Sequence, residues 1–388
     1  MIPPTIRRRD IVNNKFLKNV VFTLVVLTSL FGCTKKDNEI LIGEYGALTG
    51  NDASFGQSTN KGIRMAFDEY NSTGGIKGKQ LKLISYDDQG KPEEAAAVVK
   101  RLITQDKVVA ILGEVASSRS LAAAGIAQQY KVPMISPAST NPKVTQVGDY
   151  IFRSCFIDPF QGKVGAKFAF DNLKLKKATV LRDIKNDYSV GLADVFVEEY
   201  KKLGGEILSD MSYQAGDVDF KAQLTEMKSK NPEVIFIPGY YTEVGLIARQ
   251  ARELGIKAIL LGGDGWDGDK LSEIGKDAIN GQYYSNHYTT ESTDPLVQEF
   301  IGKFKTKYKE TPDAMAALGY DTARILAEAI QRAESLGSDK IRNEIAKTKD
   351  FVGVTGKITL NEFRNAEKGA VIVQVDNEKR KFITTVNP

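Results

Sequence analysis

Residues 108–136 read VVAILGEVASSRSLAAAGIAQQYKVPMIS, and this stretch decides the fold class. The apolar runs Val108–Gly113 and Val132–Ser136 are typical of short buried strands, and Ser118–Tyr130 between them has the length and composition of a helix. A strand, a helix and a second strand in this order form a unit with two parallel strands and the helix packed on one sheet face. The stretch therefore predicts a parallel α/β architecture.

The same alternation continues on both sides of this unit. Strand patterns at Glu39–Gly46 and Leu81–Tyr86 precede it, and the rhythm restarts after residue 158 with strands at 178–181, 206–211, 234–238 and 258–261. From Pro295 to about Lys349 the pattern is mostly helical, and two strands then close the chain, at 357–360 and 370–375. We expect two doubly wound parallel-sheet lobes joined by short crossover segments.

Composition narrows the function. The 388 residues are 42% hydrophobic and 26% charged, which is typical of a globular protein with two domains. The first 32 residues hold five of the 53 Lys and Arg and one of the 49 Asp and Glu, so 48 of each remain. A neutral body argues against nucleic acid as a partner. With one His, two Cys and no GxSxG, P-loop or HExxH motif, the sequence predicts neither an enzyme nor a metal or cofactor site.

The N-terminus is typical of an export signal. Residues 20–30 are an apolar run of 11 residues, which is shorter than the ~20 that span a bilayer as a helix, and basic residues precede it. Leu30-Phe31-Gly32-Cys33 follows and resembles a bacterial lipoprotein box. We expect residues 1–32 to be a signal peptide and Cys33 to be lipidated; the alternative is an ordinary signal with a chance Cys. Cys155 is then the remaining thiol, expected to be a small buried side chain.

Two loops that follow first-half strands could hold an anion. In parallel sheets, ligands lie beyond the carboxyl ends of the strands, beside helix N-termini. After Val108–Gly113, Ser117 or Ser118 is placed to cap the next helix, where free N–H groups and a hydroxyl suit a carboxylate. After Val132–Ser136, two prolines frame a loop of small residues that contains Ala138, Ser139 and Thr140. The alternatives are a plain helix cap and an ordinary connecting loop.

Two loops that follow second-half strands offer aromatic and acidic groups. Tyr240 and Tyr241 follow one strand and could wall a pocket, or one could pack in the core. The glycine-rich loop Gly262–Gly268 formally matches GxGxxG, but its two aspartates would repel a pyrophosphate. Asp264 and Trp266 in this loop favour contact with a cation and an apolar group. Together with the two anion loops, these features match a small zwitterion such as an amino acid.

Several short segments, in this order and spacing, resemble one family. They are Gly46-Ala47-Leu48-Thr49-Gly50 with Phe55-Gly56, Gly74-Gly75-Ile76-Lys77-Gly78, Tyr86-Asp87-Asp88, Ile135-Ser136-Pro137-Ala138, Gly239-Tyr240-Tyr241 and Arg249-Gln250-Ala251-Arg252. The chain is similar, from about residue 39 to about 376, to the periplasmic amino-acid-binding components of branched-chain amino-acid ABC transporters. The resemblance implies a bilobed fold with three crossovers.

The resemblance also implies roles for single residues in the first lobe. Ser117 falls where the family uses a hydroxyl on the ligand α-carboxylate. Ala138 and Thr140 fall where backbone groups and a Thr hydroxyl hold the carboxylate and the ammonium group. Phe55 matches an aromatic residue that shapes the side-chain pocket.

The second lobe is expected to close over the ligand. Tyr188 and Tyr241 match tyrosines that this lobe supplies, and Asp264 falls where the family places a glutamate that pairs with the ammonium group. Aspartate has a shorter reach than glutamate, so the ligand itself is left open. His287 is expected to be a structural residue near a crossover.

The resulting prediction is a solute-binding lipoprotein of an ABC importer. The first lobe is expected over 39–157 and 288–355, and the second over 158–287 and 356–388. The partners would be an amino-acid-like ligand, ABC permease subunits and a membrane, reached through the lipid on Cys33, in the periplasm or cell envelope. Two alternatives keep the same fold: an amide, urea or aromatic acid as ligand, or a sensor that reports its ligand to a receptor.

Overall fold

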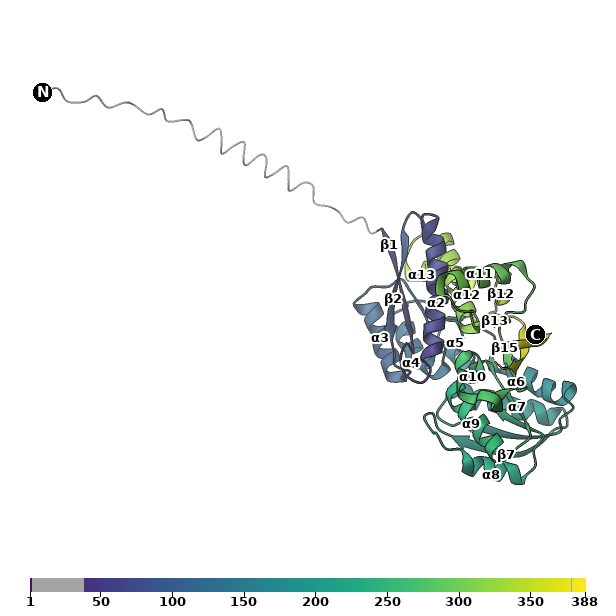
Figure 1. The fold of residues 1–388 in the computed structure, drawn as a ribbon. Coiled ribbons are helices and arrows are strands. Elements are labelled where there is room, and N and C mark those ends of the chain that lie inside the picture. The colour runs from purple at the N-terminus through teal and green to yellow at the C-terminus, as the bar shows by residue number, and fades with distance from the viewer. Residues whose placement is uncertain (2–37, 378) are drawn as a thin grey trace. The chain divides into compact units, whose positions relative to one another are not determined.

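The strands of the first half form a parallel sheet, as their apolar patterns predict. The computed structural model describes residues 1, 38–377 and 379–388 (Figure 1). The sheet has the order β2-β1-β3-β4-β5, and all of its pairs are parallel. Its strands are β1 (Glu39–Gly46), β2 (Gln80–Asp87), β3 (Ala110–Leu112), β4 (Met134–Ser136) and β5 (Ile151–Arg153).

The helices of the first lobe come from two distant parts of the chain. Local signals define their ends; for example, α3 begins with Pro92 and has Glu93 and Glu94 in its first turn. The helices between the strands are α2 (Ala53–Ser72), α3 (Pro92–Thr104), α4 (Ser117–Gln129) and α5 (Lys143–Gln146). The predicted helical region after residue 295 is confirmed as α11 (Pro295–Tyr308), α12 (Ala314–Arg332) and α13 (Ser338–Ala346).

The contact between α2 and α12 depends on glycine. A Cβ atom at Gly62 of α2 would lie 2.0 Å from the carbonyl oxygen of Ala316, and one at Gly319 of α12 would lie 2.5 Å from that of Thr59. Only glycine permits such a close approach of two helix backbones. The largest apolar core of the first lobe includes residues of both helices, among them Ile63 and Ala323.

The second lobe contains a sheet of mixed direction. Its order is β15-β14-β10-β9-β8-β6-β7, parallel from β7 to β10 and antiparallel at β14 and β15. The strands are β6 (Lys177–Asp183), β7 (Glu206–Tyr213), β8 (Val234–Ile237), β9 (Ile259–Gly262), β10 (Tyr283–Asn286), β14 (Ala370–Asp376) and β15 (Lys379–Val386). Its helices are α6 (Asp158–Lys167), α7 (Asp187–Lys202), α8 (Lys221–Ser229), α9 (Tyr241–Glu253) and α10 (Asp269–Gly275), with helical turns η1 (Phe168–Asn172), η2 (Asp264–Trp266) and η3 (Lys276–Ile279).

A small third sheet helps to locate the third crossover between the lobes. It consists of β11 (Phe351–Gly353), β12 (Gly356–Leu360) and β13 (Ala366–Glu367). Ile358 and Leu360 of β12 pack in the same core as α2 and α12, although they lie beyond the boundary expected at residue 355. We therefore propose that the third crossover lies near Lys368, just before β14.

The predicted fold class is confirmed. Two α/β lobes built on mainly parallel sheets follow the N-terminal segment. We propose that the chain passes between them at Ile157–Asp158, after β10 and before β14. Among the residues described, we find no helix with the length and apolar content needed to cross a membrane. Cys33 and the predicted signal peptide lie outside these residues, apart from Met1.

Candidate ligand-binding site

Loops from both lobes enclose one small cavity. The space between its lining atoms totals about 210 Å³, but only about 10 Å³ of it accepts the centre of a water-sized molecule, so the lining is closed tightly in this structure. The first lobe contributes Phe55 of α2, the loops that follow β3 and β4, and Met315 of α12. The second lobe contributes Tyr188, Tyr240 and η2. The full lining is Phe55, Val115, Ser117, Ala138, Thr140, Tyr188, Tyr240, Asp264, Gly265 and Met315.

Six of the nine ligand-contact residues expected from the sequence line this cavity. They are Phe55, Ser117, Ala138, Thr140, Tyr188 and Asp264. The other three, Ser139, Tyr241 and Trp266, are buried behind its wall. Strand ends that are far apart in the sequence thus supply one site, as expected for parallel sheets.

Ser117 and Ser118 have different surroundings. Ser117 is the first residue of α4, and its hydroxyl accepts a hydrogen bond from the Asn141 N–H at 3.2 Å. Ser118 donates its hydroxyl proton to the Asp187 carboxylate of the second lobe, at 2.8 Å. The expectation that one of these serines caps the helix is wrong, because Ala116 occupies the capping position. The first N–H groups of α4 therefore have no side-chain cap from that residue.

The loop after β4 is held from behind by two polar side chains. The Ser139 hydroxyl points away from the cavity and donates to the carbonyl oxygen of Glu114 at 2.9 Å, which ties this loop to the one after β3. Arg153 of β5 is fully buried, and its guanidinium donates to the carbonyl oxygens of Ser139 and Asn141. These contacts fix the backbone on which Ala138 and Thr140 face the cavity.

Asp264 is the carboxylate at the second-lobe side of the cavity. It accepts a hydrogen bond from the Gln161 amide at 2.6 Å, and its other oxygen lies 3.0 Å from His287 Nε2. The His287 ring stacks on Phe156 at 3.7 Å, and burial lowers the pKa of His287. A neutral His287 that donates from Nε2 orients Asp264 without cancelling its charge. His287 was expected to be a structural residue. It lies beside the site and holds Asp264 in place.

The aromatic wall consists of three rings. Tyr188 stacks on Tyr240 with centroids 5.5 Å apart, and the Tyr188 hydroxyl accepts from the Gly265 N–H at 3.2 Å. Phe55 meets the ring of Tyr240 edge-on at 5.5 Å. Tyr241, the residue expected from the sequence, packs on the other side of Phe55 at 4.8 Å, and its hydroxyl accepts from the Ser54 N–H. Tyr240 therefore lines the cavity, and Tyr241 supports it.

Trp266 is part of the second-lobe core. Its indole N–H donates to the carbonyl oxygen of Ile237 at 2.9 Å, and a Cβ atom at Gly262 would lie 2.0 Å from its ring. The indole thus lies under the end of β9, while the neighbouring Asp264 and Gly265 face the cavity. An aromatic contact between Trp266 and a ligand stays a prediction that this arrangement does not favour.

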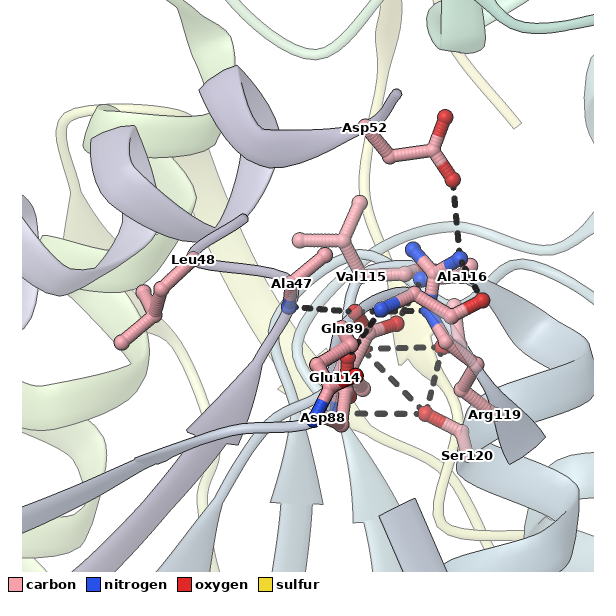
Figure 2. A network of polar contacts seen from close by, with 12 residues as sticks. Ala47, Leu48, Asp52, Asp88, Gln89, Glu114, Val115, Ala116, Arg119 and Ser120 are labelled. Carbon is pink, nitrogen blue, oxygen red and sulfur yellow. Dashed lines mark hydrogen bonds and ion pairs between the residues drawn. The ribbon is translucent and has the colours of Figure 1, made fainter. Parts of the chain in front are cut away.

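A charged cluster, buried except for Asp52, lies close to Val115 (Figure 2). We call Asp52, Asp88, Glu114 and Arg119 the Glu114 cluster. Arg119 is 2.8 Å from both Glu114 and Asp52, and the N–H groups of Ala47 and Ala116 also donate to Glu114. Burial tends to lower the pKa of Arg119, but the two carboxylates outweigh it and raise that pKa. The guanidinium therefore stays charged, while burial still raises the pKa of Glu114 and raises that of Asp88 to about 8.

Hydrogen bonds join the two lobes around the cavity. The Asp187 N–H donates to the Ser118 hydroxyl at 2.9 Å, and the Asn141 amide donates to the Asp187 carbonyl oxygen at 2.7 Å. On the opposite side, the Asp267 carboxylate of the second lobe accepts from the Ala314 N–H at the start of α12, at 2.7 Å. The lobes are therefore in direct contact in this structure.

Sequence reasoning did not select Val115, Gly265 or Met315 for the lining, and it named Tyr240 only as one of two tyrosines that could wall a pocket. Val115 and Gly265 are neighbours of selected residues, so only the turn geometry distinguishes them. Met315 belongs to α12, which contributes buried residues around most of its circumference, so no polar signal marks it. Among the residues described, no cluster of His, Cys, Asp and Glu is arranged to hold a metal ion.

Comparison with known proteins supports the fold described above. The model of the family "Periplasmic binding protein" matches residues 39–380. An amino acid binding protein from Pseudomonas aeruginosa is 32% identical over 326 residues, which cover 83% of this chain and 86% of that protein.

Two solved structures are similar over 90% of this chain. The crystal structure of a leucine binding protein, LivK, from Thermotoga maritima is 41% identical with a TM-score of 0.87, and 99% of it is covered. The branched-chain amino acid transporter substrate-binding protein LivJ from Streptococcus pneumoniae, in complex with isoleucine, is 37% identical with a TM-score of 0.86 and is covered completely, at 100%.

Proposed function

Because the chain belongs to the periplasmic binding protein family, as a substrate-binding protein of the branched-chain amino acid ABC transporter type, we propose that its ligand is a branched-chain or closely related amino acid. Its relatives are solute-binding proteins, and the chain is a binding protein rather than an enzyme. It would bind the amino acid between the lobes and deliver it to permease subunits.

The observation that carries this proposal is the division of the cavity into an apolar and a polar part. Phe55, Val115 and Met315 offer hydrocarbon and aromatic surface, which suits an aliphatic side chain. Ser117, Thr140 and Asp264 offer hydroxyl groups and a carboxylate. A zwitterion can be buried only where each of its charges gains partners.

The polar groups fit the two charges of an α-amino acid separately. The Ser117 hydroxyl and the first N–H groups of α4 suit the α-carboxylate. The Asp264 carboxylate, held by Gln161 and His287, suits the ammonium group. Thr140 and the backbone at Ala138 lie in the same lining and could contact either charge.

Because the two lobes carry different ligand contacts, we expect the lobes to close when the ligand binds. The first lobe would bind the ligand first, through Ser117 and the Ala138–Thr140 loop. Tyr188, Tyr240 and Asp264 of the second lobe would then add contacts that exist only in the closed form. A ligand shifts the equilibrium between two forms only by its difference in affinity for them, so these contacts set how far the lobes close.

A panel of ligands tests the proposal by thermal unfolding and calorimetry. L-leucine, L-isoleucine and L-valine would be compared with benzoate, acetamide and urea. We expect a branched-chain amino acid at 100 times its dissociation constant to stabilise the folded protein by about 2.7 kcal/mol. Stabilisation by benzoate or an amide, with none by any α-amino acid, would replace the proposal with one of the alternative ligands.

The lipid anchor is a separate proposal that rests on the sequence. Leu30-Phe31-Gly32-Cys33 supports lipidation at Cys33, which would tether the protein to a membrane. In cells that make the full-length protein, we expect it in the membrane fraction, with the mass of a diacylated N-terminal cysteine. The Cys33→Ser variant should leave that fraction, while Cys155→Ser should stay in it. A protein cleaved elsewhere and found free would contradict the proposal.

A further inference from the structure

Asp158 is a buried acid at the edge of the ligand site. It is the first residue of α6, at the first crossover between the lobes, and it has no exposed surface. Its N–H donates to the carbonyl oxygen of Thr140 at 3.0 Å. This bond ties Asp158 to the residue whose hydroxyl belongs to the cavity lining.

Within the described part of the chain, the polar atoms of this pair are unsatisfied. Both carboxyl oxygens of Asp158 and the hydroxyl of Thr140 are buried without a hydrogen bond. The Thr140 hydroxyl is close enough to lower the pKa of Asp158, but the contact falls short of the geometry of a full hydrogen bond. Unsatisfied buried polar atoms are costly, so their presence beside a binding cavity points to a ligand that completes them.

The charged groups around Asp158 do not provide it with a counterion. The titratable side chains that face it are Asp264, Arg153, Cys155 and Tyr188. Arg153 directs N–H groups to backbone carbonyl oxygens instead. On α7, a Cβ atom at Gly191 would lie 3.6 Å from Asp158 Oδ2. Burial therefore raises the pKa of Asp158 to about 8, although the Thr140 hydroxyl and Arg153 lower it.

We propose that Asp158 is a positioning residue that sets, through the Thr140 hydroxyl, whether the site receives an ammonium group or a neutral ligand end. This inference rests on the proposed function and deepens it. An ionised Asp158 accepts the Thr140 hydroxyl proton, which leaves the oxygen lone pairs of Thr140 free to accept from an ammonium group. A protonated Asp158 donates to the same oxygen and turns the hydroxyl proton of Thr140 toward the ligand.

The proposal has a balanced proton stoichiometry. When an ammonium group arrives, the O–H bond of the Asp158 carboxyl breaks, its electron pair stays on the carboxylate, and the proton passes to solvent. Binding of an α-amino acid near pH 7 therefore releases up to about one proton. A ligand of the same shape without the amino group leaves Asp158 protonated and releases none.

The test is calorimetry of L-leucine binding at pH 7 in phosphate and in Tris, because the enthalpy difference between the buffers counts the protons released. We expect release by the wild-type protein, no release by Asp158→Asn, and a decline to near zero by pH 9. The matched control is Asp183→Asn, which removes another buried carboxyl whose pKa burial raises, and it should release as many protons as the wild type.

The preference for the amino group gives a second readout. 4-Methylpentanoate is leucine without its amino group, and Asp158→Asn should reduce the preference for leucine over it by about tenfold. Should that variant fail to fold, Thr140→Val serves instead, because it keeps Asp158 but removes the hydroxyl through which it acts. We expect this variant to lose both the proton release and the preference.

The outcomes separate the two proposals. Leucine binding without proton release, or with equal release by the wild type, Asp158→Asn and Thr140→Val, would make Asp158 a structural residue and leave the proposed function intact. Absence of binding by any amino acid would overturn both.

Discussion

Glu114 and Asp158 are both buried acids beside the ligand cavity, but they differ in how their charge is compensated. Glu114 accepts from the N–H groups of Ala47 and Ala116 and pairs with Arg119 at 2.8 Å. Asp158 has an arginine nearby as well, yet Arg153 donates to carbonyl oxygens of the loop after β4. Arg119 thus forms an ion pair with an acid, whereas Arg153 stabilises the backbone of a loop.

This difference distinguishes structure from function. Glu114 has a cation and two N–H donors of its own, although burial still raises its pKa, so it can hold the first lobe together whether or not the site is filled. A buried carboxyl without a cation must stay protonated or gain a positive partner. The comparison thus predicts that loss of Arg119 mainly lowers stability, that loss of Asp264 mainly weakens binding, and that loss of Asp158 changes the pH dependence of both.

The largest effect is expected from Arg119→Met. This change leaves the buried Glu114 and the partly exposed Asp52 without their cation, and loss of one partner from a buried pair typically costs about 3–5 kcal/mol in the free energy of unfolding. Urea denaturation would measure it. The control Arg342→Met breaks a more exposed pair with Asp149 and should cost about 1 kcal/mol or less. Equal losses of unfolding free energy for the two variants would show that the Glu114 cluster stabilises the fold no more than an exposed ion pair does.

The next effect is on affinity. Asp264→Ala removes the carboxylate proposed for the ammonium group, and we expect α-amino acid binding to weaken by ~2–5 kcal/mol, the range for loss of one partner from a buried charge pair. Calorimetry measures the change, and 4-methylpentanoate is the matched ligand because it has no ammonium group to lose. An unchanged affinity for leucine would place Asp264 outside the site.

Asp158 should also make stability depend on pH. Its pKa is raised from 3.8 to about 8, so between these values the folded state binds more protons than the unfolded state. Stability from this group is present below about pH 4 and is lost as the pH rises toward 8. Relative to wild type, Asp158→Asn should therefore gain stability as the pH rises from 4 to 8 in urea titrations, by at most about 1.4 kcal/mol per pH unit.

Glu44→Gln is the matched comparison for that prediction. Burial raises the pKa of Glu44 from 4.5 to about 7. The pH range over which Glu44→Gln gains stability relative to wild type is therefore narrower and ends near neutral pH. If the free energies of unfolding of Asp158→Asn and wild type differ by the same amount from pH 4 to pH 8, Asp158 is ionised in the folded protein. The contrast drawn here between Asp158 and Glu114 would then be wrong.

A smaller effect is expected from Trp266→Phe. The change removes one of the two hydrogen bonds that the Ile237 carbonyl oxygen accepts, the other coming from the Gly239 N–H, and should cost about 1 kcal/mol of stability. Leucine affinity should stay within about twofold of wild type, because the indole lies behind the cavity wall. Calorimetry beside urea denaturation separates the two quantities; a large loss of affinity at unchanged stability would return Trp266 to the lining.

The smallest effect is expected from Tyr241→Phe. It removes a single hydrogen bond between the lobes, from the Ser54 N–H at 3.3 Å, and keeps the ring against Phe55. We expect affinity to fall by less than about 1 kcal/mol. Tyr240→Leu, which removes a ring from the lining itself, should weaken binding more when measured in the same titration, and the reverse order would exchange the roles of the two tyrosines.

The sequence predicts much of this arrangement because strand ends are local features. Apolar runs locate the strands, and parallel pairing brings their carboxyl ends together, which is how Ser117, Thr140 and Asp264 could be chosen from loops far apart in the chain. The order of the short motifs then identifies the family, and with it the bilobed fold.

What the sequence does not predict depends on side-chain direction. Tyr240 and Tyr241 are adjacent, and only the turn into α9 decides which ring faces the cavity. Met315 comes from a helix that packs with α2 through tertiary contacts alone. Arg153 and Asp158 did carry a signal, since a charged residue follows the apolar pair Ile151-Phe152 and an acid precedes a proline at a helix start. Their partners, however, depend on the fold.

The glycine contact between α2 and α12 has a consequence for how the molecule is made. Gly62 and Gly319 are separated by the entire contiguous part of the second lobe, so α2 leaves the ribosome long before the helix that covers it exists. When α12 has just been synthesised, the second lobe lacks only β14 and β15. Assembly of the first lobe must therefore wait for the second half of the chain, and a product truncated before residue 314 would expose the apolar face of α2 to its surroundings.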